Sequence, residues 1–446
     1  MNSYAKDLIP IIRKTCRAKE SRKYDHSPPL PANRIILALL DVAYHASCET
    51  EEGRRPGFRL ILYSPNQHKS TVDRGHRKAR YYDPQPRLLL LDQERPYTVA
   101  EVNRLAPAAE FRRFLICIRD RETEKEPSLS IWALLDMGEN WWKFVHHETS
   151  GGRPPPNFLT VTSTGPGEIS VSAQGDVLAS LKAGQITLPS TGALWHVPLN
   201  DFFDTAKKHL YKDAISRLGT KRWADKGHDD DWPYRFYNIF VERILFYTRL
   251  RAHGGTILVI PHYIQKDDTR LTDRIHIKYP SQYSYAWDLL LRSLVNHRKF
   301  FDLHFPLWEA KIEYTKELFQ EHSMLHGEKS ELDEALGDVS QAIASLTSVD
   351  GAVLMTDHFD ILGFGAEVVA LSSSLSHVHK LTGPKKSVAV PVDSFGTRHR
   401  SAFRFCSSLE EAVAFIVSQD GGVKAVKRVG KDVILWPDIN AGAMGI

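Results

Sequence analysis

Apolar residues along the chain follow two spacings, and the change from one to the other predicts helices and strands in turn. In residues 32–53, ANRIILALLDVAYHASCETEEG, apolar residues recur every three or four positions, which is typical of an amphipathic helix. Residues 58–64, FRLILYS, follow a turn-forming segment and predict a strand. Residues 98–120 return to the helical spacing, and residues 129–138 are again strand-like. The N-terminal part is therefore expected to be an α+β region.

Two breaks divide the chain. Residues 149–156, TSGGRPPP, contain three consecutive prolines, which exclude a helix and a paired strand, so a loop or sub-domain joint is expected there. Beyond it, residues 158–189 alternate apolar and polar positions between glycines, as in a β-meander. The polar and acidic residues 221–233 precede a new helix. We therefore place an N-terminal region at 1–220 and a C-terminal domain at 235–446.

The C-terminal domain alternates helices and strands. A long apolar-periodic helix, a Gly-Gly turn and a buried strand occupy residues 234–261, and further helices are expected at 285–305 and 332–349. Strand patterns follow at 350–368 and 412–436. This alternation predicts an α/β fold with a mixed β-sheet flanked by helices. The N-terminal part begins with the same helix, turn and strand order, which an internal duplication or ordinary α/β architecture would both produce.

The composition limits the classes of partner. A net charge of +4 over 446 residues is too small for the concentrated basic face of a duplex-DNA-binding protein, so nucleic acid is not an expected partner. No apolar run approaches the ~20 residues of a membrane span. Residues 1–23 also lack the apolar core of a signal peptide, so we expect no membrane span and a cytoplasmic location. The four cysteines lie far apart without metal-ligand spacing, which fits a reducing compartment.

The clearest sign of chemistry is SFGTRHRSAF at residues 394–403, where two arginines flank a histidine. Three adjacent side chains cannot share one face of a helix or strand, so this crowding of charge indicates a bound anion. Thr397 is expected to cap a helix whose N-terminal N–H groups would hold phosphate. The arginine forks and a serine hydroxyl suit phosphate oxygens, and a polyphosphate would use the whole set. The set comprises Gly396, Thr397, Arg398, His399, Arg400 and Ser401.

Acidic residues occur beside two predicted strands of the same domain. Asp350 begins DGAVL before a buried strand, and Asp420 lies in the turn SQDGG after the strand AFIV, close to Ser418. A carboxylate near phosphate commonly holds a divalent cation or orients an attacking hydroxyl. An Asp-Gly pair alone can equally cap a turn. Asp350 therefore gains a catalytic interpretation only in combination with the basic motif.

Three segments, in this order, resemble the diadenylate cyclase domain (DisA_N): DGAVL at 350–354, GTRHRSA at 396–402 and VSQDGG at 417–422. The resemblance extends over about residues 235–436 in element order. It implies an enzyme that condenses two ATP molecules into cyclic di-AMP and two pyrophosphates. Each 3′-hydroxyl would attack the other α-phosphate across a face-to-face dimer, with Mg²⁺ or Mn²⁺ as cofactor. ATP is then the expected substrate, and a homo-oligomer the expected active form.

The resemblance also assigns roles to individual residues. Asp350 would bind the metal and help to activate the 3′-hydroxyl, Gly351 would leave room for the ribose, and Ala352 completes the catalytic motif. Leu362 and Gly363 would present backbone groups to the adenine edge. The residues that would hold the phosphates are Gly396, Thr397, Arg398, His399, Arg400, Ser401 and Ser418.

The sequence departs from membrane-type relatives in two places. Those relatives have histidine before the DGA motif and two glutamates after the serine, where this chain has Val349, and Gln419 followed by Asp420. Asp420 would then replace one glutamate as a metal ligand. The departures keep a second function open, namely a sensor that binds ATP or a cyclic nucleotide in the same pocket without turnover.

The N-terminal region resembles DACNV, a probable sensor domain found in front of cyclase domains in bacterial signalling proteins. The segments that carry the resemblance are residues 39–54, 131–144 and 165–184. It implies that this region regulates the cyclase in response to an unknown signal. Trp141 and Trp142 would line a sensor pocket or fill a core, and the core interpretation is favoured.

A histidine pair is the remaining candidate site. His377 and His379 are two positions apart and would share one strand face, but no third metal ligand is evident nearby in the sequence.

Overall fold

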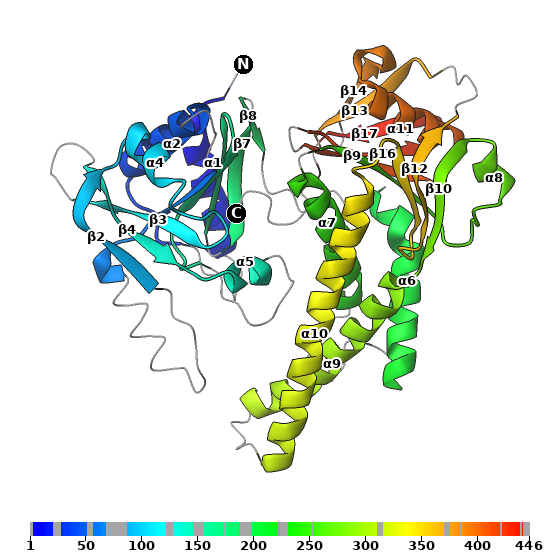
Figure 1. Cartoon of the computed structure of the whole chain (residues 1–446), viewed down its shortest axis with the longest axis horizontal. Coiled ribbons are helices and arrows are strands. Elements are labelled where there is room, and N and C mark those ends of the chain that lie inside the picture. The colour runs from blue at the N-terminus through cyan, green and yellow to red at the C-terminus, as the bar shows by residue number, and fades with distance from the viewer. Residues whose placement is uncertain are drawn as a thin grey trace. The chain divides into compact units, whose positions relative to one another are not determined.

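The structure is a computed structural model of the 446-residue chain, and it contains two compact units, residues 1–190 and 191–442 (Figure 1). None of the helices in the described part of the chain combines the length and apolar character of a bilayer span. The residues that the structure describes are 3–20, 28–50, 57–67, 87–121, 128–145, 155–173, 175–182, 184–187, 199–221, 223, 231–251, 253–309, 315–369, 375–383, 386–419, 422–437 and 439.

The described part of the first unit forms an eight-stranded mixed sheet in the order β2-β4-β3-β1-β5-β6-β7-β8. β1 pairs with β3 in parallel, and the other neighbours are antiparallel. Its helices are η1 (Ala5–Asp7), α1 (Leu8–Glu20), α2 (Asn33–Cys48), α4 (Val99–Leu105) and α5 (Asn140–Val145). Its strands are β1 (Phe58–Leu62), β2 (Arg87–Pro96), β3 (Phe114–Asp120), β4 (Leu129–Asp136), β5 (Thr160–Gly165), β6 (Glu168–Ala173), β7 (Asp176–Lys182) and β8 (Gln185–Thr187).

The alternation of side chains along β1 separates the apolar residues of this unit into two groups. Phe58 and Leu60 join the larger core, which packs against α1, α2 and α4. Ile61 and, just beyond the strand, Tyr63 belong to a smaller cluster with residues of β3 and β4. Helices α1, α2 and α4 therefore cover one face of the sheet. The predicted β-meander at 158–189 is confirmed as β5 to β8, whereas residues 149–154 of the predicted joint lie outside the described residues.

The helix predicted over residues 98–120 is wrong in its second half. α4 ends at Leu105, and residues Phe114–Asp120 form β3, which lies between β1 and β4. Pro107 follows the end of α4 at a position where it cannot continue the helix. The segment FLICIRD then forms hydrogen bonds with strands on both sides, and this pairing outweighs its helical spacing.

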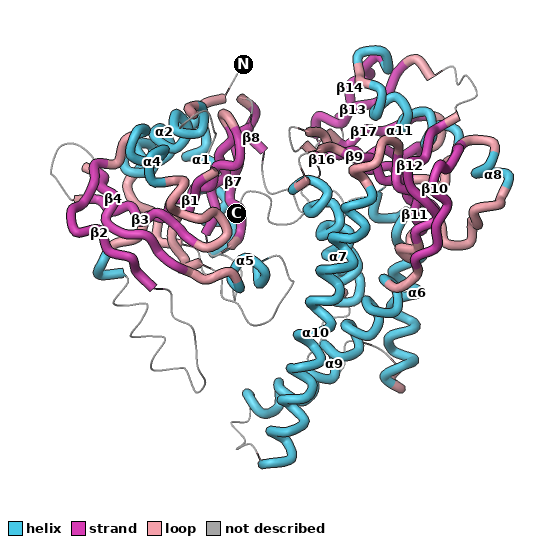
Figure 2. The backbone as a smooth tube through the Cα atoms, viewed as in Figure 1, coloured by secondary structure: helices cyan, strands magenta, loops and turns pink. Residues whose placement is uncertain are grey.

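The described part of the second unit forms a nine-stranded mixed sheet in the order β10-β12-β11-β9-β15-β16-β17-β13-β14 (Figure 2). Its helices are α6 (Leu199–Leu218), α7 (Trp232–Leu250), α8 (Thr269–Thr272), α9 (Ala286–Glu309), α10 (Lys316–Leu346), η3 (Val392–Ser394) and α11 (Thr397–Ser408). Its strands are β9 (Gly255–Ile260), β10 (Ile275–Tyr283), β11 (Ala352–Thr356), β12 (Ile361–Val368), β13 (His377–Gly383), β14 (Lys386–Pro391), β15 (Val413–Val417), β16 (Val423–Val429) and β17 (Asp432–Trp436). The predicted mixed sheet with flanking helices is confirmed.

Helices cover both faces of this second sheet. α11 packs on β9, β12, β15, β16 and β17, and Phe403 of α11 lies in the core with Leu258, Leu354 and Ile416 from the strands. On the other face, α7 contacts β15, α10 contacts β12, and α6 and α9 pack on α7. Side chains of the central strands alternate between the two faces of the sheet, and helices cover both faces. These strands therefore need apolar residues at every position, which explains why they are continuously apolar.

The division between the units falls between residues 190 and 191, and not between residues 220 and 235 as the sequence pattern predicts. The difference is α6, which the predicted boundary would include in the N-terminal region. Phe203 of α6 stacks on Phe415 of β15 with a ring-centroid distance of 6.3 Å, and Leu210 is fully buried. α6 therefore belongs to the core of the second unit.

Candidate functional site

A pocket of about 230 Å³ lies between the start of β11, the end of β12 and the first turn of α11. Residues of both sequence motifs line it, although the motifs are far apart in the chain. Thr256 and Leu258 of β9 and Glu367 of β12 complete much of the wall. The motif residues that line the pocket are Asp350, Gly351, Ala352, Thr397, Arg398, Ser401 and Ala402.

The sheet topology explains why these residues meet. β12 runs antiparallel to β11, and Ala352 pairs with Ala366, so the start of one strand and the end of the other share one edge. β9 runs parallel to β11 on its other side, and Thr256 pairs with Ala352. α11 contacts both β12 and β9. The first turn of this helix therefore lies over the edge where Asp350 enters the sheet.

Gly351 is required for this geometry. Its φ of +113° lies in the region that residues with a side chain rarely adopt. A Cβ atom at this position would lie 2.5 Å from the carbonyl carbon of Gly365 and 2.8 Å from the nitrogen of Ala366. The glycine thus allows the chain to turn tightly against β12, which places Asp350 in the pocket wall.

The start of α11 differs from the expectation that Thr397 caps it. Gly396 is the N-cap residue, with φ −68° and ψ 169°, and Thr397 is the first residue of the helix. The chain changes from extended to helical backbone at Gly396, so Thr397 is already inside. No side chain in the described part of the chain caps this end. Its first N–H groups and the positive end of its dipole are therefore available to an anion.

Helical spacing sorts the charged residues of α11. Thr397, Arg398 and Ser401 line the pocket, because positions three and four apart share one face of a helix. His399 instead packs by its ring against Phe395 and Phe403, with centroid distances of 5.6 Å and 6.2 Å. The pocket lining does not include Gly396, His399 or Arg400.

Arg398 also reaches the turn that follows β15. A Cβ atom at Gly254 would lie 2.8 Å from its Nη1 atom and 3.3 Å from the backbone nitrogen of Gln419. Ser418 precedes Gln419 in this turn, and its Oγ accepts a hydrogen bond of 3.4 Å from Nζ of Lys424. Ser418 therefore lies beside the pocket rather than in its lining. Asp420 lies outside the described residues.

The two residues proposed for the adenine edge lie further along β12. Leu362 packs on the apolar core beneath α11. Gly363 is buried, and a Cβ atom there would lie 2.3 Å from Cγ2 of Ile277. Gly363 thus permits the close approach of β10 to β12, and neither residue lines the pocket.

Sequence reasoning did not identify Glu367, a carboxylate in the pocket wall. Its Oε1 atom lies 2.6 Å from Nζ of Lys278 on β10. The pKa of Lys278 is raised, first by this hydrogen bond and then by the negative charges of Glu367 and Asp350. A signal was present in the sequence, because Glu367 is the one charged residue in the apolar strand ILGFGAEV.

The pocket offers the ligands that Mg²⁺ and Mn²⁺ prefer. Both ions bind carboxylate oxygens, and the pocket lining includes two acidic residues, Asp350 and Glu367. The donor set therefore fits a hard divalent cation.

The family comparison concerns the other unit. Residues 25–136 match the family model described as the probable sensor domain DACNV. The matched segment runs from the approach to α2 to the end of β4 and so lies within the first unit. The N-terminal sensor domain predicted from the sequence is thereby supported. No curated protein is similar enough to the chain to count as a match.

The first unit contains a buried arginine among aromatic rings. Arg59 of β1 is 1% exposed, and its Cζ atom lies 3.8 Å from the ring centroid of Phe111, 4.4 Å from Trp142 and 4.8 Å from Trp141. One Nη atom donates a hydrogen bond to the Phe111 carbonyl, and burial lowers the pKa of the guanidinium. Trp141 and Trp142 are both buried, so the core interpretation is confirmed for them.

Proposed function

We propose that the second unit is a diadenylate cyclase, which condenses two ATP molecules into cyclic di-AMP and two pyrophosphates. The observation that carries the proposal is the pocket lined jointly by Asp350 and the first turn of α11. A helix N-terminus with an arginine is suited to bind a triphosphate, and a carboxylate near it is suited to activate a hydroxyl. The resemblance of the two motifs to the cyclase domain supports the same assignment.

In this proposal the phosphates of ATP bind at the first turn of α11. Thr397 and Ser401 donate their hydroxyls, and the guanidinium of Arg398 neutralises charge that develops on the phosphate oxygens. The 3′-hydroxyl of one ATP forms a bond to the α-phosphorus of the other, and the bond to pyrophosphate breaks. One pocket supplies half of this arrangement, so two copies of the chain must bring their pockets face to face. Positioning then accounts for most of the rate enhancement.

Asp350 and Glu367 would hold Mg²⁺ or Mn²⁺, which neutralises phosphate charge when bound. Asp350 would also orient the attacking hydroxyl. Gly351 leaves that side of the pocket free of a side chain. We assign the regulation of this reaction to the N-terminal sensor unit, whose signal remains to be identified.

The test is to incubate the purified full-length protein with ATP and Mg²⁺, then Mn²⁺, and to detect cyclic di-AMP by mass spectrometry. We expect Asp350→Asn to lower the rate of product formation at least ~100-fold, within the range that acid–base groups contribute. Titration calorimetry should show that this variant still binds ATP within a few-fold of the wild type. Asp432→Asn, at an exposed carboxylate of β17, is the matched control and should keep full activity.

Two results would contradict the proposal in different ways. ATP binding without product from the full-length protein would favour the alternative function, a nucleotide sensor that uses the same pocket. Equal product from the wild type and Asp350→Asn would show that the pocket is not the reaction centre.

A further inference from the structure

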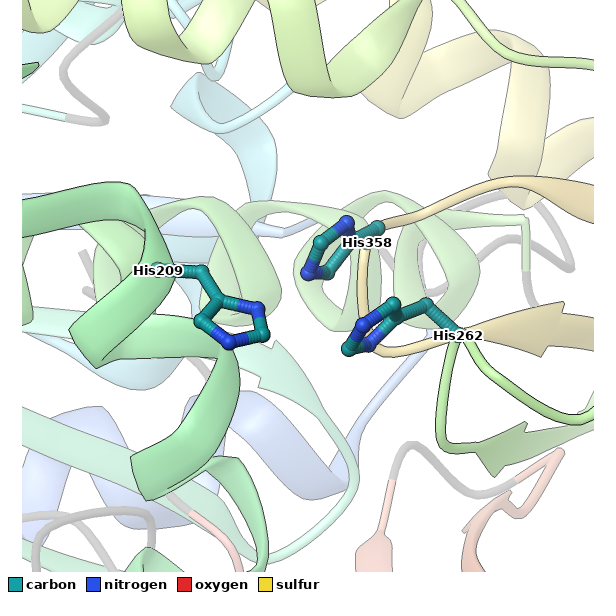
Figure 3. Close-up of side chains that lie close together, drawn as sticks. All are labelled: His209, His262 and His358. Carbon is teal, nitrogen blue, oxygen red and sulfur yellow. The ribbon is translucent and has the colours of Figure 1, made fainter. Parts of the chain in front are cut away.

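Three histidines meet at a second place in the second unit. His209 lies on α6, His262 follows β9 and His358 follows β11 (Figure 3). One nitrogen of each ring lies within 4.8 Å of the corresponding nitrogens of the other two. Among the residues that the structure describes, this is the one group of three or more histidine, cysteine or acidic side chains with metal-ligand spacing. All three side chains are partly buried.

The topology of the sheet creates this cluster. β9 and β11 are parallel neighbours, and their last residues, Ile260 and Thr356, are paired. The turns that follow them therefore lie side by side at the carboxyl ends of the strands, where ligand sites of α/β proteins form. Asp350 lies at the opposite end of β11, because it precedes that strand. The histidine cluster is thus separate from the pocket beneath α11.

His262 is oriented by a buried carboxylate. Asp357 is 2% exposed, and its Oδ1 atom accepts a hydrogen bond of 2.7 Å from the backbone nitrogen of His262 and lies 3.0 Å from its Nδ1 atom. The carbonyl oxygen of Asp357 accepts a hydrogen bond of 2.6 Å from the Tyr237 hydroxyl. When a carboxylate forms a hydrogen bond with one ring nitrogen of a histidine, the other nitrogen can bind a metal. This arrangement is usual for metal-bound histidines.

Ring stacking, and not a hydrogen bond at Nε2, holds His358 in place. Its ring lies between those of Trp287 and His262, with a centroid distance of 3.8 Å to each and interplanar angles of 5° and 11°. Its Nε2 atom is buried and has no hydrogen-bond partner in the described part of the chain. A buried imidazole nitrogen without a partner is costly, and a ligand would satisfy it.

Parallel rings cannot both direct an in-plane lone pair at one ion, so one ring must rotate when an ion binds. Because His262 is fixed by Asp357, we assign the rotation to His358, which would leave its stack with Trp287. His209 approaches edge-on, at centroid distances of 5.1 Å from His262 and 5.7 Å from His358.

We propose that His209, His262 and His358 form a binding site for a divalent cation of the zinc class, with water as a fourth ligand. Neutral imidazole prefers Zn²⁺, Co²⁺, Ni²⁺ or Cu²⁺ to Mg²⁺, and three histidines with one open position form a familiar zinc site. The ion would join α6, the first described helix of this unit, to the ends of β9 and β11. The proposal does not depend on cyclase activity.

The binding test uses full-length protein treated with a chelator and then titrated with Zn²⁺ by calorimetry. We expect one ion per chain, and a weakening of at least ~10-fold in His209→Gln and in His358→Gln, because the loss of even a group that only supports a metal ligand typically costs about 10- to 100-fold in affinity. Co²⁺ in place of Zn²⁺ should give visible absorption bands of a tetrahedral site, absent in both variants. The matched control is His377→Gln with His379→Gln, a pair on β13 outside the cluster, which should bind as the wild type does.

Unchanged affinity in His209→Gln would overturn the three-histidine site, and so would equal loss in the control variant. His209→Gln carries the test if His358→Gln does not fold, because His209 lies on the partly exposed face of a helix. A wild-type protein that takes up no Zn²⁺ and shows no Co²⁺ spectrum also contradicts the proposal.

The bridging role of the ion has its own readout. Zn²⁺ at about one hundred times its dissociation constant should raise the Tm of the wild type on the order of 5 °C and slow amide exchange in α6. Trp287→Phe reports the rotation of His358, because the zinc-induced change in tryptophan fluorescence should be lost in this variant while binding remains. If Zn²⁺ protects α6 equally in His209→Gln, the ion does not bridge the helix, and that part of the proposal fails.

Discussion

At the scale of single residues, Gly351 shows how backbone geometry restricts a site to one residue type. Its positive φ and the 2.5 Å approach to the backbone of Gly365 exclude any side chain. We expect Gly351→Ala to lower the free energy of unfolding by about 3 kcal/mol or more, because both strain and contact with backbone oppose the methyl group. Chemical denaturation of the purified variant measures this.

The control for this substitution is Gly327→Ala. Gly327 lies within α10, and a Cβ atom there would have no neighbour within 4 Å. Alanine should therefore stabilise the helix by roughly 0.5–1 kcal/mol. If both substitutions changed stability by the same amount, the close contact at Gly351 would have no energetic weight.

Lys207 gives a pH dependence with a definite sign. It is 1% exposed, its Nζ atom donates a hydrogen bond of 2.7 Å to Asn200, and burial lowers its pKa to about 8. Between pH values of about 8 and ~10.4, the folded chain has lost the Lys207 proton, whereas the unfolded chain, whose lysine pKa is ~10.4, still binds it. Stability should therefore rise with pH from about 8 to ~10.4, by up to about 1.4 kcal/mol per pH unit, and show no Lys207 contribution to the slope below this range.

Lys207→Met should remove this part of the slope in denaturation curves recorded from pH 7 to 10.5. Lys212→Met changes the charge of the same helix at an exposed position and serves as the control. If the stability of the wild type and of Lys207→Met changed with pH in the same way, Lys207 would not be the source of the slope.

At the scale of elements, α11 determines which basic residues can meet a ligand. Arg398 lines the pocket, whereas Arg404 of the same helix is exposed outside it. If ATP binds there, Arg398→Ala should weaken binding about 10-fold or more, since a hydrogen bond to a charged group contributes about 1.5–3 kcal/mol. Arg404→Ala should change it less than about two-fold. Calorimetry with ATP distinguishes the two, and equal effects would remove α11 as the phosphate site.

The same helix shows how far sequence alone predicts the site. The two motifs identified Asp350, Thr397, Arg398 and Ser401, because local spacing places them at a strand entry and on one face of a helix start. Glu367 could not be predicted in the same way. Its place in the pocket depends on the pairing of β12 with β11, which is a contact between strands and not a property of either one.

The elements themselves show the same limit. Long periodic segments such as α7 and α9 agree with the prediction, because an amphipathic pattern over many turns has few alternatives. The helix predicted at 332–349 is only the second half of α10, which begins at Lys316. β3 was mistaken for helix, since its apolar run fits either structure until its neighbours on both sides are known. The histidine cluster was missed for a related reason: its three members come from three segments that only the sheet and α6 bring together.

At the scale of the whole molecule, each unit has its own sheet and its own apolar core, so each is expected to fold independently. The position of α6 determines where the second unit must begin. This helix buries apolar side chains against the core of that unit, and Phe203, Leu199 and Leu210 are the largest of them.

A chain that starts at Thr191 should therefore unfold cooperatively, with a stability close to that of the same unit within the full-length protein. A chain that starts at Asp231 lacks α6 and exposes the apolar surface of α7 and β15 that Phe203 and Leu210 cover. Because burying one large apolar side chain contributes about 1.5–3 kcal/mol, the loss of α6 should exceed about 4 kcal/mol, which is most of the stability of an ordinary domain. Calorimetric unfolding of the two chains measures the difference, and dye binding to exposed apolar surface should increase only in the shorter one. Equal transition temperatures would instead place α6 outside the cooperative unit and return the boundary to residues 220–235.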